Sequence, residues 1–168
     1  MGCGGSLGSL FPANKFLQVE SSKIKSAWIN SNEFLHSTPK DFGKNSILIL
    51  ACHKGDTPET VKAAEFGKEK GAAVVLLTWL EESPIIEYGD YIIRYTFGDD
   101  KDVSGEKTMC ALLLAVELLN QTEGYDSYDV FLSGTEKIGR IVKLACEHVE
   151  KRAAVFAKNH KDDKVIYT

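Results

Sequence analysis

Two apolar runs, separated by a segment of helix length, constrain the fold more than any other feature of the sequence. Residues 46–52 (SILILAC) and 72–79 (AAVVLLTW) are almost continuously apolar. Such runs are typical of strands buried on both faces of a parallel sheet. Between them, Thr57 is suited to cap a helix, Pro58 to begin it and Gly71 to end it. The stretch therefore predicts a strand–helix–strand unit with parallel strands.

The rest of the chain continues to alternate between helical and extended patterns. Further helices are expected over residues 6–19, 30–39, 104–120 and 127–159. Further strands are expected over residues 23–29, 90–95 and 164–168, with a short helix or turn over residues 83–89. Strands that alternate with helices favour an α/β fold in which helices cover both faces of a parallel sheet.

Composition and charge exclude several classes of protein. The chain has 168 residues and a net charge of −4, whereas nucleic-acid binders usually carry a basic face. The longest apolar runs, residues 71–80 and 109–119, are too short for a bilayer, which takes about 20 residues. We therefore expect neither a nucleic-acid nor a membrane partner. The opening MGCGGS matches an N-myristoylation pattern, but a glycine-rich loop is the favoured alternative.

The cysteines indicate a reducing compartment. Cys3, Cys52, Cys110 and Cys146 form no CxxC pair, and none is spaced from a histidine like a zinc ligand. We therefore expect no disulfide, no metal site and a cytoplasmic location.

The two ends of the chain indicate a piece of a longer protein. The chain opens on a loop that no strand precedes, and it closes within an apparent strand. We therefore expect a domain over residues 1–125 whose first strand is missing. A helical connector over residues 126–160 and the start of a second domain over residues 161–168 should follow.

Two loops precede helices at the carboxyl ends of strands, where open parallel sheets bind their ligands. They are residues 3–6, with two glycines, and residues 52–57. A helix start offers unpaired backbone N–H groups and partial positive charge, which suit a phosphate. Gly55 permits a tight turn and Thr57 supplies a hydroxyl group. These features alone leave open whether the loops hold a phosphate or only turn the chain.

The order of residues around the second loop resembles the signature of the SIS (sugar isomerase) family. The matching residues are Gly55, Asp56, Thr57, Glu59, Thr60, Lys68, Gly71, Ala72, Ser83, Pro84 and Asp90. The opening CGGS is similar to the first phosphate-side loop of that family, so the resemblance covers roughly residues 3–120. It implies a three-layer, flavodoxin-like fold, with a parallel sheet between helices, and a sugar-phosphate substrate.

Within that family, the chain is most similar to the N-terminal SIS domain of fructosamine-6-phosphate deglycases. The cues are CGGS, NEFLHSTP, the loop CHKGDTPET and the late KVIYT. Those enzymes carry two SIS domains in tandem and cleave a sugar-phosphate adduct to glucose 6-phosphate and an amine. Two alternatives stay open: an aldose–ketose isomerase acting on fructose 6-phosphate or glucosamine 6-phosphate, and a non-catalytic phosphosugar-sensing module.

The resemblance also implies roles for individual residues. The implied substrate-binding residues are Gly4, Gly5, Ser6, Cys52, His53, Lys54, Gly55, Thr57 and Ser104. The first three would border the sugar, and the loop around Gly55 and Thr57 would hold the phosphate. Cys52 and Lys54 stand where the family usually has small hydroxyl residues. We expect phosphate binding to be retained, because the backbone N–H groups and Thr57 remain.

Glu33 and His53 are candidate catalytic residues, each with a structural alternative. His53 could open the sugar ring or move a proton, or it could simply hold the loop together. Glu33 could approach the sugar, or it could stabilise the start of its helix by its charge. Ser104 and Lys107 open the apolar helix and could lie near the site, and the alternatives are a plain helix cap and an exposed lysine.

The remaining catalytic groups are expected from outside this chain. Proton transfer between sugar carbons needs a general base, and ring opening needs a histidine. In the family these come largely from the second domain or a neighbouring subunit. We therefore expect this segment alone to be inactive and its protein to form a homodimer or a larger assembly. No cofactor is expected.

Overall fold

The computed structural model describes residues 1–95 and 103–163, except for the side chains of residues 103 and 104. It divides into two compact units, Met1–Tyr125 and Asp126–Thr168, and each is described by itself.

The first unit is built on a parallel sheet. Its described strands are β1 (Ile47–Ala51), β2 (Ala73–Thr78) and β3 (Tyr91–Arg94), in the order β1-β2-β3. Residues 1 and 2 lie along the other edge of β1. The Ala51 N–H donates to the Met1 carbonyl over 2.9 Å, and the Ser31 N–H donates to the Gly2 carbonyl over 3.0 Å. β1 and β2 coincide with the two apolar runs and pair in parallel, with one helix between them in the sequence. The expected strand–helix–strand unit is therefore confirmed.

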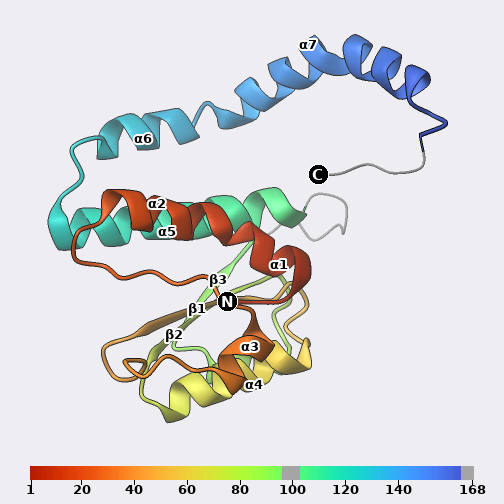
Figure 1. Cartoon of the computed structure of the whole chain (residues 1–168). Coiled ribbons are helices and arrows are strands. Elements are labelled where there is room, and N and C mark those ends of the chain that lie inside the picture. Colours follow the sequence, from red (N-terminus) through yellow and green to blue (C-terminus); the bar gives the residue numbers. More distant parts are fainter. Residues whose placement is uncertain (96–102, 164–168) are drawn as a thin grey trace. The chain divides into compact units, whose positions relative to one another are not determined.

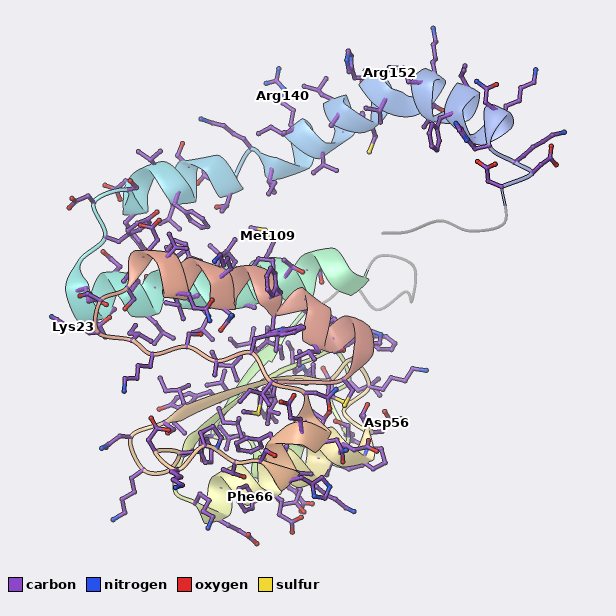
Figure 2. All side chains as sticks on the ribbon, viewed as in Figure 1. Lys23, Asp56, Phe66, Met109, Arg140 and Arg152 are labelled. Atoms are coloured by element: carbon purple, nitrogen blue, oxygen red, sulfur yellow. The ribbon has the colours of Figure 1, made fainter. Side chains whose placement is uncertain are left out.

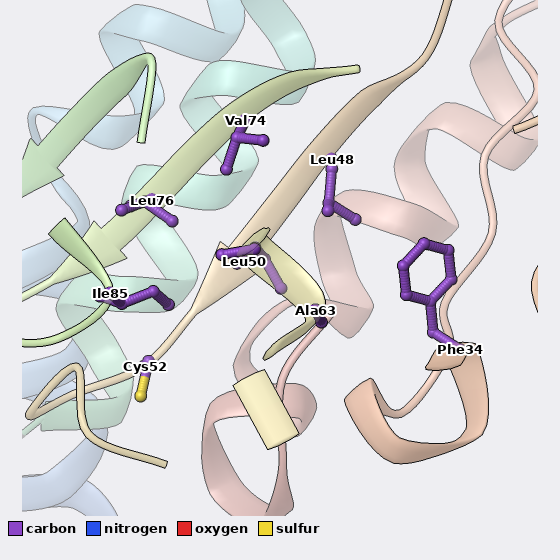
Figure 3. Close-up of a cluster of buried hydrophobic side chains, with 9 residues drawn as sticks. Phe34, Leu48, Leu50, Cys52, Ala63, Val74, Leu76 and Ile85 are labelled. Atoms are coloured by element: carbon purple, nitrogen blue, oxygen red, sulfur yellow. The ribbon is translucent and has the colours of Figure 1, made fainter. Parts of the chain in front are cut away.

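One face of the sheet is covered by α3 (Ser31–His36) and α4 (Pro58–Glu69), as Figure 1 shows. The short 3-10 helix η1 (Ile86–Tyr88) packs beside α4. The buried side chains between this layer and the sheet are Phe34, Leu48, Leu50, Cys52, Ala63, Ala64, Val74, Leu76 and Ile85, most of which Figure 3 labels. They are almost all aliphatic, so burial of apolar surface holds this layer in place.

The opposite face is covered by α2 (Phe11–Glu20) and α5 (Val103–Glu123), which pack closely together (Figure 1). The short helix α1 (Gly4–Ser9) leads into α2 and also contacts α5. The buried core on this side consists of Leu10, Ala13, Leu17, Ala51, Leu77, Ala111, Ala115 and Leu119. Helices on both faces make three layers, which confirms the predicted fold class.

Two expectations for the N-terminal region are wrong. The helix expected over residues 6–19 is two helices, because the chain turns at Leu10 before Pro12 enters the first turn of α2. Residues 23–29 do not form the expected strand, and only Asn30 makes a single bridge to Gly2. A cavity of about 680 Å³, lined in part by residues 23–29 and 46–49, lies beside β1. Within residues 1–95 and 103–163, residues 23–29 pair with no strand.

The second unit consists of α6 (Tyr128–Thr135) and α7 (Ile138–Asn159) among its described residues. One continuous helix was expected over residues 127–159. The helix is instead interrupted at Glu136 and Lys137, where the Lys137 N–H donates to the Gly134 carbonyl, three residues back. The strand expected over residues 164–168 lies outside the described residues. No described helix has both the length and the apolar character needed to cross a membrane.

Candidate functional site

The starts of three helices meet at the edge of the sheet where β1 ends. The Sγ of Cys3, which precedes α1, lies 3.7 Å from the Thr60 Oγ1 in the first turn of α4. The same Thr60 hydroxyl lies 3.2 Å from the Ser31 Oγ at the start of α3. Thr60 and Ser31 are fully buried. The two loops that the sequence singled out are thus neighbours in the fold.

The loop between β1 and α4 is shaped by Gly55. Its φ of +69° is a backbone conformation that is unfavourable for residues with a Cβ atom. A Cβ built on Gly55 would lie 2.0 Å from the Ser83 Oγ. The Gly55 carbonyl accepts a hydrogen bond of 3.1 Å from the Ile85 N–H. The loop is therefore held close against the segment that follows β2.

The start of α4 offers uncommitted hydrogen-bond donors. Thr57 is the N-cap residue, as predicted, but its hydroxyl makes no capping bond. Among the described residues, the backbone N–H groups of Gly55, Asp56, Thr57 and Glu59 have no acceptor. Figure 2 shows Asp56 at the surface beside this helix start. Free N–H groups, a free hydroxyl and the partial positive charge of a helix start are the chemical groups that an anion such as a phosphate needs.

The two residues that depart from the family pattern lie in different environments. The Cys52 side chain is 3% exposed and belongs to the apolar cluster beneath the loop, as Figure 3 shows. Its backbone N–H donates to the Leu77 carbonyl over 3.0 Å. The Lys54 side chain is exposed. Cys52 is thus placed as a core residue, whereas Lys54 remains at the surface of the loop.

His53 is held among aromatic side chains at the ends of β2 and β3. Its Nδ1 lies 2.8 Å from the Tyr95 Oη, and its ring stacks against Trp79 at a centroid distance of 5.2 Å. Its carbonyl accepts hydrogen bonds from the Thr78 Oγ1 and the Trp79 N–H. Burial raises the pKa of the Tyr95 phenol above its ordinary value, so Tyr95 stays protonated. These contacts favour the role of His53 in holding the loop.

Lys107 is the functional candidate that sequence reasoning misjudged. It was weighed as an exposed lysine, but its side chain is only 4% exposed and its Nζ donates to the Ser6 Oγ over 2.9 Å. Burial lowers the pKa of its ammonium group. The spacing along the helix indicates this burial. Lys107 lies one helical turn before Ala111 and two before Ala115, and both alanines are buried. The side chain of Ser104 lies outside the described residues.

The remaining predicted site residues lie at the surface. Gly4 and Gly5 are exposed at the start of α1, and a Cβ on either would meet no atom within 4 Å. Glu33 is exposed in the first turn of α3. Its carboxylate has no hydrogen-bond or ion-pair partner in the described part of the chain. Within residues 1–95 and 103–163, no group of three His, Cys, Asp or Glu side chains is placed to hold a metal ion.

Comparison with known proteins gives a consistent assignment. The model of the SIS domain family matches residues 14–120. Fructosamine deglycase FrlB of Bacillus subtilis is 31% identical over 99% of this chain and 51% of its own length. The isomerizing glutamine–fructose-6-phosphate aminotransferase of Sulfolobus acidocaldarius is 22% identical over 67% of this chain and 20% of its own length.

A solved structure gives the same result. A protein from Salmonella typhimurium LT2, provisionally described as a phosphosugar isomerase, superimposes with a TM-score of 0.91 at 44% identity. The match covers 99% of this chain and 50% of that protein. The chain thus spans about half the length of FrlB and of this protein. The parallel sheet, its two helical layers and these matches show that the chain belongs to the SIS domain family.

Proposed function

We propose that this chain is the phosphosugar-binding domain of a fructosamine-6-phosphate deglycase. Such an enzyme uses water to split a sugar-phosphate adduct into glucose 6-phosphate and the free amine. The observation that carries this proposal is the 31% identity to fructosamine deglycase FrlB over 99% of the chain. The free donors at the start of α4 supply the chemistry that a phosphate group needs.

In the proposed complex, the phosphate lies at the start of α4. It accepts hydrogen bonds from the backbone N–H groups of Gly55 and Thr57 and from the Thr57 hydroxyl. The sugar lies toward Ser6, bordered by the exposed Gly4 and Gly5. The adjoining starts of α1 and α4, 3.7 Å apart at Cys3 and Thr60, support a single ligand that spans both loops.

The general base and the ring-opening group are proposed to come from a second SIS domain or another subunit. Within this chain, Glu33 and His53 remain the candidates, but His53 already contacts Tyr95 and Trp79. The second unit supports such a partner, because α7 carries exposed apolar residues. These residues are Ile138, Ile141, Val142, Leu144, Val149, Val155 and Phe156. We propose a homodimer or a larger assembly, and the four free thiols fit a cytoplasmic location.

A second candidate is an aldose–ketose isomerase. The observation that favours it is the 44% identity to the Salmonella typhimurium protein provisionally described as a phosphosugar isomerase. Assays with the full-length protein separate the two. A deglycase releases amine and glucose 6-phosphate from fructosamine 6-phosphate. An isomerase interconverts free aldose and ketose phosphates and releases no amine.

The phosphate site is tested by binding to the full-length protein in phosphate-free buffer. Glucose 6-phosphate at 100 times its Kd should stabilise the protein by about 2.7 kcal/mol, whereas glucose should not. Thr57→Ala should weaken binding at least about 10-fold, since a hydrogen bond to a charged group contributes roughly 1.5–3 kcal/mol. Isothermal titration calorimetry gives both affinities.

The matched control is Thr122→Ala, because the Thr122 hydroxyl donates to a carbonyl within α5. This variant should bind glucose 6-phosphate like the wild type. Unchanged binding in Thr57→Ala would show that the phosphate lies elsewhere. Failure of the wild type to bind any phosphosugar would overturn the proposed function.

A further inference from the structure

Lys107 is a buried cation without an anionic partner in the described part of the chain. Its side chain is 4% exposed, and the hydrogen bond that it makes is to the Ser6 Oγ at 2.9 Å. No described carboxylate forms an ion pair with it. Removing an ammonium group from water is costly unless it is paired. An apolar side chain at this position would therefore stabilise the fold better than lysine does.

The hydrogen bond between Lys107 and Ser6 has a fixed direction. An ammonium group only donates, so the Ser6 oxygen is the acceptor. The proton of the Ser6 hydroxyl must then point elsewhere, and it has no acceptor among the described residues. A hydroxyl that accepts from a cation is polarised and becomes a stronger donor. The Ser6 hydroxyl therefore keeps one proton to donate. The hydrogen bond from Lys107 fixes the direction of that proton and makes the hydroxyl a stronger donor.

The position of Ser6 indicates what that donor meets. Ser6 lies in α1, whose preceding residue Cys3 contacts Thr60 at the start of α4. The free N–H groups and the Thr57 hydroxyl lie at the same helix start. Ser6 therefore supplies a donor from one side of the site while α4 supplies donors from the other. All of these groups donate, which selects a ligand rich in acceptor oxygens.

We propose that Lys107 is a positioning residue of the ligand site, acting through Ser6. Lys107 holds the Ser6 hydroxyl so that its proton is donated to an oxygen of the bound sugar phosphate. This inference rests on the proposed phosphosugar function. The cost of burying the ammonium group is then explained by binding rather than by stability, which is a common compromise at functional sites.

The test compares Lys107→Met, Ser6→Ala and the double variant in the full-length protein, with glucose 6-phosphate as the ligand. Each single variant should weaken binding about 10-fold or more. Because Lys107 acts through Ser6, the double variant should bind no more weakly than the weaker single variant. The Tm of Lys107→Met without ligand should equal or exceed that of the wild type. A purely structural lysine would instead give a lower Tm and unchanged affinity.

Two further variants keep the test decisive. Lys15→Met removes an exposed lysine of α2 and should leave binding unchanged. Lys107→Gln keeps a donor without the charge and should bind with intermediate affinity. If Lys107→Met does not fold, Lys107→Gln and Ser6→Ala carry the same comparison.

Failure of this inference can be told apart from failure of the proposed function. If the Lys107 variants bind like the wild type while Thr57→Ala loses affinity, the role of Lys107 is overturned and the phosphosugar site stands. Additive losses in the double variant would also overturn action through Ser6. If the wild type binds no phosphosugar, the proposed function itself fails.

Discussion

Gly55 shows how a single residue fixes the shape of the loop between β1 and α4. The segment after β2 lies so close that a Cβ on Gly55 would also come within 2.7 Å of the Ser83 Cβ. The Ser83 Cβ is bonded directly to the backbone, so rotation of the side chain does not move it aside. The positive φ and the lack of space act together, and both point to glycine.

Gly55→Ala should therefore destabilise the first unit by about 1–3 kcal/mol, through backbone strain and overlap with Ser83. It should also weaken phosphosugar binding, because the N–H groups of the loop must shift. Urea denaturation and calorimetry measure the two effects. The control is Gly8→Ala in α1, where a Cβ meets no atom within 4 Å. That change should be neutral or stabilising. Wild-type stability in Gly55→Ala would contradict this account.

At the same scale, some site residues could be predicted from the sequence and others could not. Gly55 and Thr57 are recognisable because local backbone chemistry demands them at a loop before a helix. The aromatic contacts of His53 with Trp79 and Tyr95 depend on three strand ends meeting, which no local pattern encodes. The burial of Lys107 was not predicted, because a charged side chain is usually exposed. Its spacing of four residues from the buried Ala111 places it on the buried face of α5.

Among the elements, α4 and β1 pack closely at Gly67. A Cβ built on Gly67 would lie 2.4 Å from the Leu48 Cδ2 and 3.5 Å from the Val74 Cγ2. The helix can therefore approach the sheet only because this position carries no side chain. This contact joins the end of α4 to the start of β1, so it fixes the helix against the sheet at the end opposite the loop of residues 52–57.

Gly67→Ala tests this packing. In an exposed helix the change would be stabilising by roughly 1 kcal/mol. Here overpacking against Leu48 should make it destabilising by about 1–3 kcal/mol. The cost should shrink in a Leu48→Ala background, which opens the space that the new methyl group needs. A double-mutant cycle measured by urea denaturation gives the coupling. Additive effects would show that the two positions do not compete for space.

The elements that were predicted correctly are those whose own run of apolar residues indicates burial. The strands at residues 46–52 and 72–79 are apolar on both faces, as a central parallel strand must be. Residues 23–29 alternate like a strand, but a strand also needs a hydrogen-bonding neighbour. Among the described residues this segment has no such neighbour, and only the adjoining Asn30 makes a bridge, to Gly2. The stretch 127–159 was expected to be helical throughout, whereas α6 and α7 are separate at Glu136 and Lys137, within the run SGTEK that contains no apolar residue.

For the molecule as a whole, Glu123 ties the end of α5 to the loop that follows α2, about 100 residues earlier. Its carboxylate accepts hydrogen bonds from the Ser21 and Ser22 hydroxyls and from the Ser22 and Lys23 N–H groups. Lys23 is labelled near the end of α5 in Figure 2. These donors, Ser21 first, lower the pKa of Glu123 from its ordinary value of 4.5 to about 2. The link therefore depends on an ionised carboxylate.

The free energy of unfolding of the first unit should fall as the pH is lowered from about 4.5 to about 2. The unfolded chain takes up a proton at Glu123 near pH 4.5, whereas the folded chain resists until about pH 2. The stabilisation is thus complete above pH 5 and lost near pH 2. In thermal unfolding, Glu123→Gln should be less stable than the wild type at pH 7 and nearly equal to it near pH 2. Ser21→Ala should reproduce part of the effect. A difference independent of pH would exclude this linkage.

The arrangement of the whole protein is the part that the sequence leaves as a prediction. The connector over residues 126–160 and the second domain from residue 161 stay predictions, because they concern packing partners that no local sequence pattern identifies. The first compact unit ends at Tyr125, two residues after the end of α5.

The stacking of Trp79 on His53 provides a built-in optical reporter. The chain has two tryptophans. Trp28 contacts α1, where its indole N–H donates to the Leu7 carbonyl. Replacing Trp28 with phenylalanine would leave Trp79 as the sole indole emitter in this chain, in contact with a residue of the loop between β1 and α4. A ligand that rearranges His53 would alter the fluorescence of Trp79, so the kinetics of ligand binding could be followed by stopped flow without any added label.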